Sequence, residues 1–113
     1  MTKLEILRGA RKLVANPSTW LRGSMAVNQA GHSTDPMSPY AVRFCSVGAI
    51  WHVAGDMNEA FNITREMGKN ADGLSLMSVN DRKGQIAALK MFDKEIAKEE
   101  ALAEKNRKEI VFS

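Results

Sequence analysis

Among its 113 residues the sequence has one cysteine, Cys45, and two histidines. One cysteine cannot form an internal disulfide, and this usage fits a reducing compartment, so we expect a cytoplasmic protein. A zinc site of the usual cysteine and histidine kind needs more such ligands, and Asp81-Arg82-Lys83-Gly84 lacks the glycine spacing of phosphate-binding loops. We therefore predict no metal and no cofactor.

Long apolar runs are also missing. The longest uncharged run near the middle, Phe44 to Gly55, has 12 residues, whereas a helix that spans a bilayer needs about 20. The first residues, MTKLEILRG, mix charged with apolar side chains and do not resemble a signal peptide. We expect an intracellular protein with no membrane association.

The charge is nearly balanced, with a formal net charge of +3. The basic excess lies at the two ends of the chain, and the first 23 residues carry five basic side chains and one acidic one. These five are candidate phosphate contacts: Lys3, Arg8, Arg11, Lys12 and Arg22. So small an excess is equally typical of a solvated surface, so nucleic-acid binding is one alternative among others.

Residues 38–56 are the most apolar stretch of the chain. Ser38 is a suitable helix cap, Pro39 suits the first helical position, and Gly55 suits a left-handed exit. These signals predict a helix over residues 39–54. Because it is apolar on nearly all sides, we expect it to be buried at the centre of the domain.

Three further helices are predicted, over residues 3–15, 57–67 and 85–108. Thr2 and Glu5 have the spacing of a capping box, and a stripe of apolar residues runs from Ile86 to Ile96. Residues 24–36 have no helical period and fit either a small hairpin around 28–31 or an irregular loop. Alternation at Leu74 and Leu76 predicts either a short strand or an extended crossing segment over 74–79, which could pair with 24–28.

The chain should thus form one mostly α domain, with about four helices around a buried central helix and a small β element. We place this domain at residues 1–97 and a charged helical extension at residues 98–113. The extension ends in a small apolar tag, residues 110–112, that either folds back or meets a partner.

Cys45 and His52 lie on the same face of the predicted central helix. Seven residues separate them, which is about 10 Å along a helix axis, so they cannot form a catalytic dyad. Cys45 would lie too deep in this helix for the helix N-terminus to lower the pKa of its thiol, and we expect a buried core residue. Gly48 makes the same face thin, which fits either a closely packed neighbouring helix or the floor of a pocket with His52 at its rim.

Asn80-Asp81 precedes the last predicted helix. These residues suit a cap or turn, and two adjacent polar side chains of this type also suit the orientation of a ligand. The sequence leaves both readings open.

Several of these residues together resemble a family of small proteins of unknown function encoded by bacteria and their phages. Members typically read W, then G, then AVRWCxxGA, then WND before a terminal helix. Here the corresponding residues are Trp20, Gly23, the run AVRFCSVGA over 41–49, and Asn80-Asp81. The chain departs in Phe44 and Val79, where the family commonly has tryptophan. The resemblance implies one compact domain ending near Ala97 and singles out Cys45, Gly48, Asn80 and Asp81.

No catalytic motif appears in the sequence. Our leading hypothesis is a small accessory protein, of a kind that phages also encode, that binds another macromolecule, with a second copy of the chain as one option. The alternatives are a small-ligand binder or enzyme with a site at Cys45, Gly48, His52, Asn80 and Asp81, and a nucleic-acid binder that uses the basic first helix.

Overall fold

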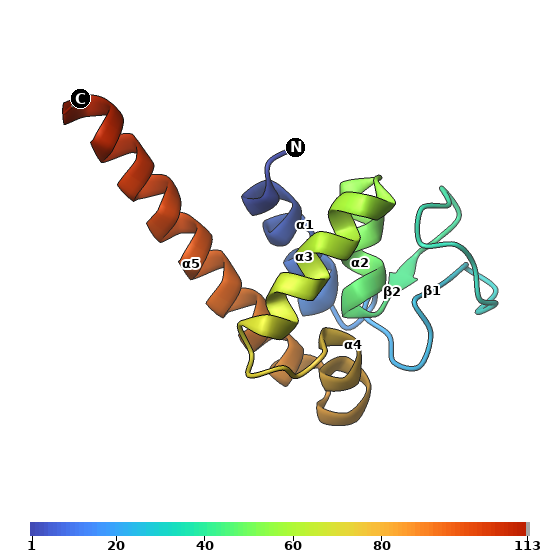
Figure 1. Ribbon diagram of the computed structural model, residues 1–113. Coiled ribbons are helices and arrows are strands. Elements are labelled where there is room, and N and C mark those ends of the chain that lie inside the picture. The colour runs from blue at the N-terminus through green and yellow to red at the C-terminus, as the bar shows by residue number, and fades with distance from the viewer. Residues whose placement is uncertain (113) are drawn as a thin grey trace.

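A computed structural model describes residues 1–112, with side chains to residue 109, and shows a mostly helical domain with a small sheet (Figure 1). The helices are α1 (Lys3–Ala15), α2 (Ser46–Ala54), α3 (Met57–Lys69), α4 (Leu76–Ser78) and α5 (Gln85–Phe112). A π-helical turn, Val79–Lys83, continues α4. Strands β1 (Ala26–Val27) and β2 (Arg43–Phe44) pair antiparallel.

The predicted first helix is confirmed with its bounds. The Thr2 hydroxyl accepts from the Glu5 amide while the Glu5 carboxylate accepts from the Thr2 amide, which completes the capping box. The apolar face of α1, which includes Ile6, Leu7 and Val14, is fully buried. It packs against both α2 and α5, so α1 joins the first half of the core to the second.

The predicted start of the central helix is wrong. The helix begins at Ser46 rather than Pro39, and the chain before it is extended. The Phe44 amide donates to the Thr19 carbonyl at 2.7 Å, and the Phe44 carbonyl accepts from Leu21 at 2.9 Å. These long-range bonds hold residue 44 in an extended conformation, and the local signal of Ser38-Pro39 does not outweigh them. The predicted end is correct: Gly55 has φ 64° and closes the helix.

The strand expected over residues 74–79 is also wrong. The Ser75 hydroxyl accepts from the Ser78 amide at 3.1 Å and caps a helical turn there. The partner of β1 is β2 rather than this segment. The turn expected around residues 28–31 is present, with Gly31 at φ 83°, and a single bridge between Val27 and Ser33 joins its flanks.

Helix α5 extends well beyond the rest of the domain (Figure 1). Its first half packs on α1, whereas every residue from Ala101 to Glu109 is exposed. The side chains of the expected apolar tag, 110–112, lie outside the described residues. Within residues 1–112, no helix is long and apolar enough to cross a membrane.

Candidate functional site

Asn80 is at the centre of a buried polar junction. In the π-helical turn the Gly84 amide donates to the Val79 carbonyl, five residues back, and Asn80 is completely buried. Its Oδ1 accepts from the Trp20 indole N–H at 2.7 Å, the Ser46 amide at 3.0 Å and the Ser46 hydroxyl at 2.7 Å. One side-chain oxygen therefore holds the start of α2 against the tryptophan.

The other half of the amide extends the junction to Asp81. Asn80 Nδ2 donates to the Leu21 carbonyl at 3.1 Å and to Asp81 Oδ1 at 3.0 Å. The same Asp81 oxygen accepts from the Gly23 amide at 3.1 Å. Both polar atoms of the Asn80 side chain are thus satisfied within the protein, as buried amides require.

Cys45 is the N-cap of α2, which corrects its expected position deep inside a helix. Its Sγ accepts from the Gly48 amide at 3.3 Å, and the residue is 1% exposed. Burial raises the pKa of the Cys45 thiol despite the capping bond. A protonated buried thiol is a poor nucleophile. We therefore assign Cys45 two structural roles: it caps α2 and it fills space in the core.

The thin face at Gly48 is covered by backbone. A Cβ built on Gly48 would lie 1.9 Å from the Met25 carbonyl oxygen, and the Cys45 amide donates to that same oxygen at 3.1 Å. The sequence suggested either a neighbouring helix or a pocket at this face. Both suggestions are wrong, because the Met25 backbone fills the space. Gly48 allows the segment before β1 to approach α2.

His52 lies one helical turn after Gly48 on the same side of α2. Its Nδ1 lies 2.7 Å from the Pro36 carbonyl oxygen, and its ring centroid lies 4.5 Å from that of Phe44. The ring is half-buried. These contacts pin the loop before β2 to the helix.

Over residues 1–98 the chain matches the model of a family of unknown function (DUF6197). The chain belongs to this family. The matched range contains all the residues of the junction around Asn80. No curated protein and no solved structure matches the chain.

The basic side chains of α1 are largely neutralised by α5. Arg8 Nη2 lies 3.2 Å from Glu100 Oε1, and Arg11 Nε lies 2.5 Å from Asp93 Oδ1. The hydrogen bond to Asp93 raises the pKa of Arg11. Of the three other candidate phosphate contacts, Lys3 is ion-paired, Lys12 is exposed, and the guanidinium carbon of the exposed Arg22 lies 5.6 Å from the Trp20 ring centroid.

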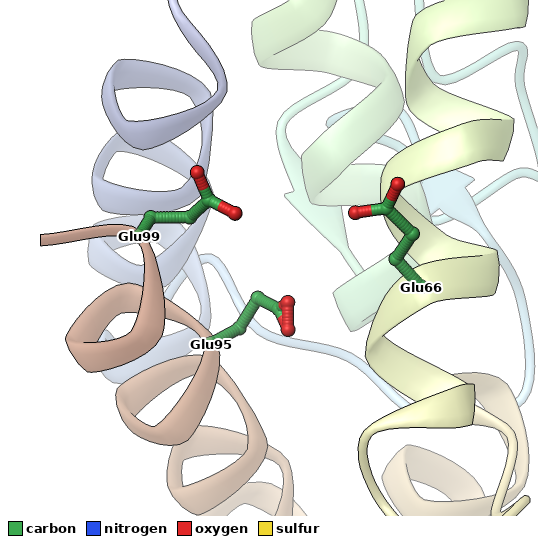
Figure 2. A group of neighbouring side chains, drawn as sticks. All are labelled: Glu66, Glu95 and Glu99. Carbon is green, nitrogen blue, oxygen red and sulfur yellow. The ribbon is translucent and has the colours of Figure 1, made fainter. Parts of the chain in front are cut away.

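Lys3 is surrounded by carboxylates. Glu66 of α3 and Glu95 and Glu99 of α5 point toward a common space (Figure 2). The Lys3 ammonium bonds Glu66 and lies 3.0 Å from Glu99 Oε1 and 3.5 Å from Glu95 Oε2. Burial opposes the charge on Lys3, but its hydrogen bonds to Glu66 and Glu99 prevail and raise its pKa, and the same bond to Lys3 lowers the pKa of Glu66. The ammonium thus offsets the repulsion among the three carboxylates.

A cavity of about 550 Å³ opens between α2, α3 and α4. We call it the apolar groove. Its apolar lining comes from Met25, Val47, Trp51, Phe61, Leu76 and Met77. Two cations of α3, Arg65 and Lys69, also line it, and no acidic residue does.

Sequence reasoning missed this groove. Phe61 is one of the apolar residues within the predicted helix over 57–67, together with Ala60, Ile63 and Met67. The structure buries those three but leaves Phe61 58% exposed. The available signal was angular: Phe61 lies about 200° around a helix from Ile63, so the two side chains cannot share one face.

Proposed function

We propose that this protein is a cytoplasmic accessory protein that binds an apolar segment of another protein in the apolar groove. The observation that carries the proposal is the exposure of Phe61 and Met77, 58% and 42%, beside a hollow whose lining is almost wholly apolar. Aromatic residues and methionine are enriched where proteins bind one another.

The exposed apolar surface continues beyond the hollow itself, at Leu74 and Met57. A small ligand would fill the cavity and leave this rim in water, whereas a protein segment would cover both. None of Cys45, His52, Asn80 and Asp81 lines the groove. The surface around the groove therefore favours a macromolecular partner over a small-ligand site at those four residues.

A selection from a display library of random peptides tests the proposal. We expect selected peptides to carry apolar anchors and to bind the wild-type protein. Phe61→Glu and Met77→Glu each place a charge in the groove and should weaken binding at least about tenfold, because an aromatic anchor contributes about 2 kcal/mol or more.

Leu102→Glu is the matched control. Leu102 lies on α5, is 44% exposed, which is close to the exposure of Met77, and does not line the groove. Circular dichroism and thermal unfolding should show that all variants fold, and sedimentation should show whether a second copy is the partner. A selection that gives no peptide dependent on Phe61 or Met77 would overturn the proposal.

A further inference from the structure

We infer that the segment which occupies the apolar groove is acidic, with two carboxylates beside its apolar anchors. This inference rests on the proposed function and names the chemistry of the partner. Its basis is the pair of cations at the groove, Arg65 and Lys69, neither of which forms an ion pair with any of the described residues.

Arg65 lies beside the anchor that the partner would contact. Its guanidinium carbon lies 5.9 Å from the Phe61 ring centroid, and its only polar contact among the described side chains is a 3.4 Å bond to the neutral amide of Asn62. The cation–π contact orients the group over the aromatic ring without cancelling its charge.

Lys69 is the last residue of α3, one helical turn after Arg65. Glu66 and Asp72 are the nearest acidic residues along the chain, each three positions away. Neither lines the groove, and within residues 1–109 no carboxylate oxygen lies within 4.0 Å of the Lys69 ammonium. The contrast with Lys3, Arg8 and Arg11 is direct, because all three have carboxylate partners.

The two positive charges therefore belong to the surface that a partner covers. When the segment displaces water, a carboxylate beside Arg65 or Lys69 gains attraction in a less polar medium, whereas a lysine there meets like charge. The cations are four residues apart, about 6 Å along the helix. Two acidic residues four apart in a helical partner, or two apart in an extended one, match that distance.

The test uses one peptide whose binding depends on Phe61, made in three versions with glutamate, glutamine or lysine flanking the anchors. Fluorescence anisotropy at low and high salt measures the affinity of each version. On the wild-type protein at low salt, we expect the glutamate version to bind at least about tenfold more tightly than the lysine version, with a smaller ratio at high salt.

The double substitution Arg65→Gln and Lys69→Gln should reduce this ratio to about twofold or less. The matched control is Lys90→Gln with Lys94→Gln, which removes two exposed cations with the same spacing from α5, away from the groove. The control should keep the wild-type ratio.

The outcomes separate the two proposals. Equal affinity for the glutamate and lysine versions, or a ratio that survives the Arg65 and Lys69 substitutions, overturns the acidic partner while the groove remains a binding site. A selection that gives no peptide dependent on Phe61 or Met77 overturns both.

Discussion

Replacing Gly48 by alanine should destabilise the fold, although the same change at a helical glycine is ordinarily favourable. The new Cβ would lie 1.9 Å from the Met25 carbonyl oxygen and 2.7 Å from its carbon. The Cβ and the oxygen must separate by about 1.5 Å to reach an ordinary contact of 3.4 Å, and in a dense interior the backbone before β1 has to move.

The magnitude follows from three contributions. Overpacking of this kind costs about 1–3 kcal/mol. Movement of Met25 also weakens the 3.1 Å bond from the Cys45 amide to the Met25 carbonyl, a net loss of about 1 kcal/mol. The better helix propensity of alanine stabilises the fold by at most about 1 kcal/mol. We therefore expect the free energy of unfolding to fall by about 1–3 kcal/mol.

Guanidinium denaturation of Gly48→Ala and Gly68→Ala side by side is the assay. A Cβ on Gly68 would lie 3.4 Å from the Leu74 carbonyl oxygen, an ordinary contact. That variant should be neutral or more stable by up to about 1 kcal/mol. A stabilised Gly48→Ala variant, or equal changes in both proteins, would refute the close approach of Met25 to α2.

Asn80→Ala should lower the free energy of unfolding by about 3 kcal/mol, because it leaves the buried donors of Ser46 unpaired, and a loss below about 1 kcal/mol by denaturant titration would contradict the junction. Lys3→Met should cost about 2 kcal/mol at neutral pH, because three carboxylates lose their ammonium, and calcium should raise the melting temperature of this variant more than that of the wild type. The stability difference between Lys3→Met and wild type should shrink below pH 4.5: the pKa of Glu66 is lowered in the folded protein, so its contribution is present above the unfolded value and is lost as the pH falls toward the folded one. The Cys45 thiol should react with a disulfide reagent only as fast as the protein opens, and rapid labelling of the native protein would contradict its burial.

Local signals in the sequence were enough to predict α1, α3 and α5. The Thr2 and Glu5 capping box and the apolar stripe that starts at Ile86 act over three or four residues, and the structure confirms all three helices. The structure shows that Asp56 caps α3. The family resemblance is likewise confirmed, because its motif lies in a few short blocks of the chain.

Features set by distant parts of the chain could not be predicted in this way. The start of α2 depends on bonds from Phe44 to Thr19 and Leu21, which no spacing within 38–56 reveals. The part that Asn80 plays at the start of α2 was missed for the same reason. The position of Phe61 around the helix separates it from Ile63, but the sequence does not show that α2 and α4 leave a cavity beside it.

The junction at Asn80 also sets an order of events during synthesis. Its amide bonds Trp20 and Leu21, which precede it by 60 and 59 positions, and Ser46, which precedes it by 34. Contacts this distant in sequence carry a large cost in loop-closure entropy, which slows folding. Until Asn80 has emerged from the ribosome, the amide and hydroxyl of Ser46 cannot donate to its side chain and remain open to water. Translation speed across residues 47–80 should for this reason influence how much of the nascent chain reaches the native state.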